Sequence, residues 1–85
     1  MLQVSKELSV SQIDNESVVL DAVSGKYFGL NPTARRIFEV LQSTGSEELT
    51  IKTLVTEFAV EEDRLRKDVT AFAELLVAKG LARRV

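Results

Sequence analysis

Few side chains in this sequence are suited to catalysis or metal binding. There is no cysteine and no histidine, which excludes disulfides, thiolate chemistry, the usual structural zinc sites and imidazole acid–base catalysis. The remaining candidates are carboxylates, Lys26 and Tyr27, and they form no paired-carboxylate site, glycine-rich phosphate loop or nucleophile motif. We therefore expect no catalytic residue, no metal site and no cofactor, and an enzyme is the least favoured function class.

The sequence is better suited to recognition through the backbone, and residues 20–32 carry this signal. Two short apolar runs flank Ser24-Gly25, a pair typical of a tight turn because glycine tolerates positive φ. Tyr27 and Phe28 suit a half-buried strand, where their side chains would point to opposite faces. Gly29 indicates either a bulge or a place where another backbone comes close. An open edge here could accept an extended peptide through unpaired N–H and C=O groups.

Four segments between Leu20 and Leu81 have an order and spacing that resemble the PqqD-like family, also called RiPP recognition elements. Besides the hairpin, they are residues 31–38 (Asn-Pro-Thr-Ala-Arg-Arg-Ile-Phe), 68–72 (Asp-Val-Thr-Ala-Phe) and Gly80-Leu81. Members of this family capture the leader segment of ribosomally made precursor peptides. The resemblance therefore implies a non-catalytic peptide-binding domain.

The resemblance also implies where the leader lies. In this family the leader pairs with the third strand and occupies a groove against the third helix, which here are residues 26–30 and 63–76. Helical geometry, at about 100° per residue, puts four side chains on one flank of that helix's apolar stripe: Arg64, Asp68, Ala71 and Leu75. The expected peptide-binding residues are therefore Lys26, Tyr27, Phe28, Gly29, Leu30, Arg64, Asp68, Ala71, Phe72 and Leu75.

Ordinary structural roles remain open for several of these residues. The two apolar residues of the flank could pack as part of an amphipathic helix, and Phe72 is better suited to the core than to direct contact with a peptide. Lys26 and Arg64 could simply be solvated. Asp68 could form a surface ion pair with Arg64, one turn away.

Composition favours one small domain, residues 1–85, because the sequence is 45% hydrophobic and contains a single proline. The formal net charge is −2, which provides no overall attraction to nucleic acid. No apolar run is long enough to cross a bilayer, and the N-terminus lacks the features of a signal peptide. We therefore expect a cytoplasmic protein with neither nucleic acid nor a membrane as its partner.

Three antiparallel strands are expected in the first part of the chain. Apolar residues of one parity between Leu2 and Val10 predict a single amphipathic N-terminal strand. A polar connection over residues 13–17 follows it. The two strands of the hairpin are then expected over residues 18–22 and 26–30.

Three helices are expected in the rest of the chain. Asn31-Pro32 predicts a helix start, because Asn can cap a free N–H and Pro fits the first turn; this helix should end near Ser43. Thr50 is the expected cap of a second, short helix. The third helix should begin near Glu61, where negative charge suits the helix dipole, and stop at Gly80.

These elements correspond to an α+β fold of the winged-helix-turn-helix type, with a three-stranded antiparallel sheet followed by three helices. The family resemblance implies the same topology. The sheet cannot bury its apolar face alone, so the helices must cover it. The expected core includes Val18, Leu20, Phe28, Leu30, Ile37, Phe38, Leu41, Leu54, Phe58, Val69, Phe72 and Leu76.

The favoured function is binding of a precursor leader peptide by strand addition and its delivery to separate processing enzymes. A chain of this length resembles the stand-alone recognition proteins of lasso-peptide pathways, whose implied partners are a leader-cleaving cysteine protease and a macrocyclising enzyme. The first alternative is a PqqD-type peptide chaperone for quinone-cofactor biosynthesis. The second is a DNA-binding winged helix, although residues 61–63 would place three carboxylates beside the phosphates.

Overall fold

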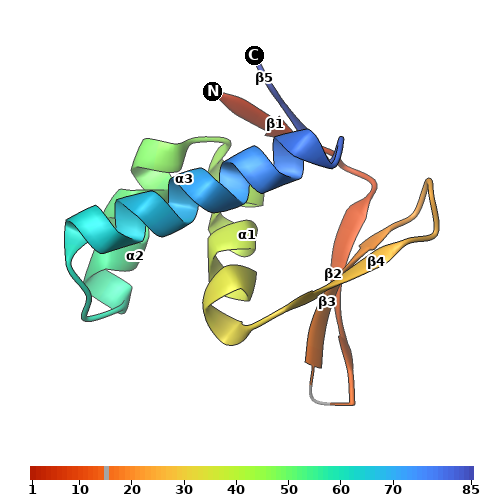
Figure 1. Cartoon of the computed structure of the whole chain (residues 1–85), viewed down its shortest axis with the longest axis horizontal. Helices are drawn as coiled ribbons and strands as arrows, with labels where there is room; N and C mark the ends of the chain where they lie inside the picture. The colour runs from red at the N-terminus through yellow and green to blue at the C-terminus, as the bar shows by residue number, and fades with distance from the viewer. Residues whose placement is uncertain (15) are drawn as a thin grey trace.

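The computed structural model describes residues 1–14 and 16–85. Its elements, in chain order, are β1 (Leu2–Val4), β2 (Leu8–Ile13), β3 (Glu16–Asp21), β4 (Tyr27–Leu30), α1 (Pro32–Thr44), α2 (Glu47–Glu57), α3 (Glu62–Ala78) and β5 (Ala82–Arg84). Figure 1 shows the sheet β2-β3-β4 at one side of the molecule and the helices at the other, with α1 following directly after β4. The expected α+β fold, a three-stranded antiparallel sheet followed by three helices, is confirmed.

The N-terminal segment is the main correction to the expected strands. It forms two strands instead of one: β2 pairs with β3, whereas β1 pairs with the C-terminal strand β5 in a separate two-stranded sheet. The alternation of apolar residues is the same in both strands, so it could not indicate that the pairing partner changes between Val4 and Leu8. As a result, the two ends of the chain lie side by side (Figure 1).

The polar connection expected over residues 13–17 is also shorter than predicted. Ile13 is the last residue of β2, and Glu16 and Ser17 already belong to β3. Asp14 adopts a left-handed conformation with φ of 49°, and Asn15 lies outside the described residues.

The turn between β3 and β4 is stabilised by a single aspartate. One carboxylate oxygen of Asp21 accepts a bond of 3.0 Å from the Val23 N–H, and the other accepts one of 2.9 Å from the Ser24 hydroxyl. The Ser24 hydrogen bond is the main cause that lowers the pKa of Asp21. Gly25 takes the left-handed conformation, with φ of 74°, as expected for this turn.

Side-chain caps define the starts of the first two helices. The Ala34 N–H donates to Asn31 Oδ1 at 2.7 Å, which confirms the predicted start of α1. The predicted cap of α2 was wrong: the Leu49 N–H donates to Ser46 Oγ at 3.1 Å, and the helix begins at Glu47. Thr50 instead lies inside the helix, where its hydroxyl donates to the Ser46 carbonyl. Both residues are good capping types, and only the earlier one precedes helical backbone.

The core forms where the three helices meet and where α1 packs against β3 and β4. Phe38 and Phe72 make an edge-to-face contact, with ring centroids 6.5 Å apart. Side chains exposed by 1% or less include Phe38, Leu41, Ile51, Leu54, Leu65 and Val69. These residues join the helices into a single packed unit.

Most of the predicted core is confirmed. Six of its members are buried in the core cluster: Ile37, Phe38, Leu41, Leu54, Val69 and Leu76. Val18 is also buried, but it lies outside this cluster. Four more are partly buried and pack against the core: Phe28, Leu30, Phe58 and Phe72. The prediction that Leu20 belongs to the core was wrong, because Leu20 is 38% exposed. In β3 the core-facing residue is Val19, and adjacent side chains of a strand point to opposite faces.

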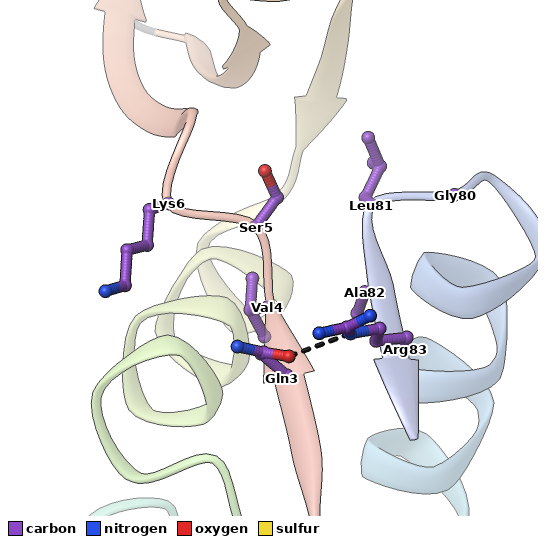
Figure 2. Close-up of a pocket in the computed structure, with 8 residues that line it drawn as sticks. All are labelled: Gln3, Val4, Ser5, Lys6, Gly80, Leu81, Ala82 and Arg83. Carbon is purple, nitrogen blue, oxygen red and sulfur yellow. Dashed lines mark hydrogen bonds between the residues drawn. The ribbon is translucent and has the colours of Figure 1, made fainter. Parts of the chain in front are cut away.

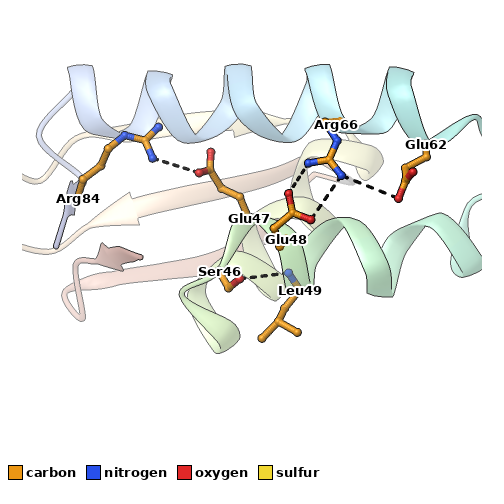
Figure 3. Close-up of polar contacts among 7 residues, drawn as sticks. All are labelled: Ser46, Glu47, Glu48, Leu49, Glu62, Arg66 and Arg84. Carbon is orange, nitrogen blue, oxygen red and sulfur yellow. Dashed lines mark hydrogen bonds and ion pairs between the residues drawn. The ribbon is translucent and has the colours of Figure 1, made fainter.

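Exposed ion pairs link α2 to α3 and to β5, as Figure 3 shows. Arg66 of α3 pairs with Glu48 of α2 and with Glu62 one turn earlier in its own helix. The hydrogen bond from Arg66 is the main cause that lowers the pKa of Glu48. Arg84 of β5 pairs with Glu47 at 3.1 Å. The start of α2 is therefore connected to both α3 and β5.

Candidate functional site

The strand β4 has an open edge. In the sheet order β2-β3-β4, this strand has β3 as its only partner among the described residues. The Asp21 N–H donates to the Lys26 carbonyl at 2.9 Å, and hydrogen-bonded pairs alternate along an antiparallel ladder. Phe28 and Leu30 therefore bond to β3, whereas the N–H and C=O groups of Tyr27 and Gly29 point toward the open edge.

Gly29 does not form a bulge. The register between β3 and β4 runs without interruption, with Gly29 opposite Val18 and Phe28 opposite Val19. A Cβ atom built at Gly29 would meet no heavy atom within 4 Å. The interpretation of Gly29 as a bulge is therefore wrong. The other interpretation, that another backbone comes close at this position, remains a prediction.

A groove lies beside this edge, between β4 and the start of α1 on one side and α3 on the other. It consists of two adjoining cavities of about 240 Å³ and about 360 Å³, which share Asn31, Ala34, Phe72 and Leu75. The walls are mostly apolar, and the first cavity also includes Val19, Leu76 and Leu81. An open strand edge next to an apolar groove can hold an extended chain, because the edge bonds its backbone and the groove takes its alternate side chains.

Seven of the ten predicted binding residues line this groove: Phe28, Gly29, Leu30, Asp68, Ala71, Phe72 and Leu75. They come from β4 and α3, the two elements that the sequence indicated. Their contact with a peptide remains a prediction. Leu75 is 48% exposed and lines both cavities, so its role is not limited to helix packing.

The other three predicted residues do not line the groove. Lys26 is exposed and lies just before β4. Tyr27 is 67% exposed, and its side chain points to the face opposite that of Phe28. Arg64 is exposed in the first turn of α3, one turn before Asp68. Tyr27 can take part only through its backbone or from the outer face of the sheet.

Sequence reasoning missed two groove residues that matter for its chemistry. Asn31 was assigned only to helix capping, yet it lines both cavities. Lys79 was not among the predicted binding residues, yet it lines the first cavity and its Nζ lies 4.9 Å from the centroid of the Phe28 ring. A helical signal was available, because Lys79 is eleven residues, about three turns, after Asp68.

The surface ion pair between Arg64 and Asp68 is not formed. Among the described residues, the ion pairs with N–O distances up to 4.0 Å involve other residues of α3, including Arg66 with Glu48 and Glu62. Asp68 is thus a groove-lining carboxylate with no cationic partner in the described part of the chain.

A further cavity of about 260 Å³ lies at the two-stranded sheet β1-β5. Figure 2 shows that the Gln3 and Arg83 side chains meet across the strands, and Arg83 Nε donates to Gln3 Oε1 at 2.8 Å. Lys6 extends from the β1 side, away from β5. The cavity shares Leu81 with the groove but has no part of the β4 edge.

No described helix has the length and apolar character needed to cross a membrane.

Two solved structures that resemble this one contain a bound leader peptide. One is described as "TbiB1 in Complex with the TbiA(beta) Leader Peptide"; it is 26% identical, has a TM-score of 0.80, and the match covers 98% of this chain and 96% of that chain. The other is described as "Lasso peptide synthetase B1 complexed with the leader peptide"; it is 32% identical, has a TM-score of 0.78, and the match covers 98% of both chains.

No match was found among the curated proteins. A family model does match, over residues 16–82, and its description is "Coenzyme PQQ synthesis protein D (PqqD)". The match includes β3, β4 and all three helices, and it therefore includes every residue that lines the groove. This protein belongs to the PqqD family.

Proposed function

We propose that this protein binds the leader segment of a ribosomally made precursor peptide as an additional strand on β4. The observation that carries the proposal is the open β4 edge beside an apolar groove. Two similar structures, both of complexes with a leader peptide, support the same class of ligand, and one of them is described as a lasso peptide synthetase B1. The backbone groups of Tyr27 and Gly29 would bond the leader, and the groove would select its side chains.

The protein would catalyse no reaction itself and would present the leader to separate enzymes. For a lasso-peptide pathway, these are a leader-cleaving cysteine protease and a macrocyclising enzyme. The described residues contain no group of three or more Asp and Glu side chains placed to hold a metal ion, and the groove has Asp68 as its carboxylate. The groove is therefore best suited to binding a ligand.

The test is a titration of the purified protein with a labelled synthetic leader from the precursor encoded beside its gene. A scrambled peptide of the same composition is the matched control, and the precursor of a quinone-cofactor pathway tests the alternative chaperone role. Saturable binding of the lasso leader alone is expected. Equal binding of the leader and the scrambled peptide would contradict the proposal.

Duplex DNA at several salt concentrations forms a third arm of this experiment. The first turn of α3 exposes Glu62 and Asp63, and Arg66 is already paired with carboxylates. Both features oppose contact with phosphates. We expect no saturable DNA binding, and tight binding that weakens steeply with salt would favour a DNA-binding protein instead.

Delivery is tested separately from binding. The precursor is incubated with the protease encoded beside it, with and without this protein, and the initial rate of leader cleavage is measured. The rate should rise when the protein is added. A protein that binds the leader without raising this rate would have no delivery role toward that protease.

A further inference from the structure

The two ends of the groove carry opposite charges that have no partner within the described chain. Lys79 lines the cavity next to Val19 and Leu81, and its Nζ rests over the Phe28 ring. Asp68 lines the other cavity, beside Ala71 and Thr33. Each of the ion pairs found in the described residues involves other side chains. Both charges are therefore free to pair with a ligand.

Apart from Asn31, the wall shared by the two cavities is apolar, so a ligand would meet charge only at the ends. Phe28, Leu30, Ala34, Phe72 and Leu75 lie along this part of the groove. The contact with Phe28 holds the Lys79 ammonium at the groove wall, where a cation over an aromatic face is favourable. The exposed Leu75 separates the two charged ends along α3.

The distance between the two charges sets a spacing for the ligand. Eleven residues of α3 separate Asp68 from Lys79, which corresponds to about 16 Å at about 1.5 Å per residue. An extended peptide rises about 3.3 Å per residue, so this distance equals about five peptide residues. In an extended peptide every second side chain faces α3. The two charged residues of the ligand must therefore be an even number of positions apart, about four or six.

We propose that the groove selects a leader segment with an acidic residue beside Lys79 and a basic residue beside Asp68, about four to six positions apart, with apolar residues between them. This inference rests on the proposed function and specifies the ligand of the same groove. β4 begins near Lys79 and ends at the cavity that contains Asp68. A leader antiparallel to β4 therefore carries its basic residue on the N-terminal side of the acidic one.

Double-mutant cycles with the synthetic leader of the neighbouring precursor test this proposal. Lys79→Gln and Asp68→Asn are each combined with leaders in which one acidic residue is changed to Gln or one basic residue to Gln. We expect one acidic leader position to couple to Lys79 and one basic position to couple to Asp68. Each pairing should change affinity by roughly two- to fivefold at low salt, as for partly exposed ion pairs.

A charge exchange provides a rescue that a purely structural role would not produce. The double variant D68K/K79E should bind the natural leader roughly three- to tenfold more weakly. A leader with its two charges exchanged should recover that loss. The matched control is K52E/E74K, which makes the same two changes of charge at exposed positions that line neither cavity and should leave the affinity unchanged.

The outcomes separate this inference from the proposed function. If the leader binds but no leader charge couples to either residue, the inference is wrong and leader binding stands. The inference is also wrong, and leader binding stands, if the two coupled leader positions are not about four to six residues apart, or if the leader with exchanged charges fails to recover affinity for D68K/K79E. If the leader does not bind the unmodified protein, the proposed function fails and this inference fails with it.

Discussion

Tyr27 and Phe28 have different roles, although they are adjacent residues of β4. Phe28 packs against the core and bonds to β3, whereas Tyr27 is exposed and presents its backbone groups at the open edge. Alternation along a strand is a property of the backbone, so both assignments follow once the pairing with β3 is known. The backbone edge and the groove-facing side chains are therefore supplied by different residues.

The open edge can be tested with proline at Tyr27. The N–H of this residue points away from β3, so Tyr27→Pro removes a donor that the sheet does not use. Leader affinity should fall about two- to tenfold, the loss of one net hydrogen bond, relative to Tyr27→Ala. Urea unfolding should show similar stability for the two variants, and equal leader affinities would exclude the edge as the binding surface.

Phe28→Pro serves as the contrasting variant. It removes an N–H that bonds to β3 and also deletes a side chain that packs against the core. We expect lower stability for this variant in the same urea experiment, so weaker leader binding by Phe28→Pro would not report on the edge.

Leu75 allows a test of the groove itself. Leu75→Ser removes an exposed apolar side chain that lines both cavities, and Leu49→Ser removes a similarly exposed leucine, 50% against 48%, from α2 outside the groove. Leader affinity should fall about threefold or more for the first variant, from the lost burial of apolar area. Similar effects of the two substitutions in a binding titration would contradict a groove at α3.

At the scale of elements, the side-chain caps of Asn31 and Ser46 determine where α1 and α2 begin. Ser46 starts α2 directly after Gly45, whose carbonyl accepts a bond of 2.8 Å from the Leu2 N–H. Gly45 has φ of 66°, and a Cβ there would approach the Leu2 carbonyl oxygen to 2.9 Å. The end of α1, the start of α2 and the strand β1 are therefore connected at one point.

Removing the α2 cap should destabilise the fold without changing the groove. Ser46→Ala leaves the Leu49 N–H without its side-chain acceptor, at a cost of about 1 kcal/mol. Chemical denaturation should show this decrease in unfolding free energy, while leader affinity at low temperature stays the same. Unchanged stability would mean that solvent satisfies the Leu49 N–H as well as the Ser46 hydroxyl does.

At the scale of the whole molecule, stability is expected to fall in acid. The pKa values of Asp21 and Glu48 are lowered in the folded state, mainly by the hydrogen bonds from Ser24 and Arg66. A lowered pKa means that the unfolded chain binds protons more readily, so the contribution is present above the ordinary values of 3.8 and 4.5 and disappears as the pH falls through the folded values.

Urea unfolding between pH 6 and pH 3 measures this dependence. The unfolding free energy should decrease as the pH falls below about 5, and the double variant Asp21→Asn with Glu48→Gln should show a weaker decrease. An identical pH profile for the variant and the unmodified protein would mean that other carboxylates account for the acid sensitivity.

The sequence was sufficient for features that depend on local chemistry. The turn at Ser24-Gly25, the cap at Asn31, and the succession of strands followed by three helices follow from turn propensity, capping and periodicity. Each of these signals acts within a few residues along the chain. The family resemblance indicated that β4 and α3 together form the binding site, and seven of the ten binding residues predicted in this way line the groove. Periodicity alone does not predict that these two elements lie together.

Only the tertiary structure decided which segments become partners. The pairing of β1 with β5, the orientation of Val19 toward the core in place of Leu20, and the position of Lys79 over Phe28 all join residues that are distant in sequence or of equal local propensity. Alternation and helical spacing define faces, but they do not specify what each face meets. The partner of a face depends on which packing buries the most apolar surface for the chain as a whole, and that is a property of the complete fold.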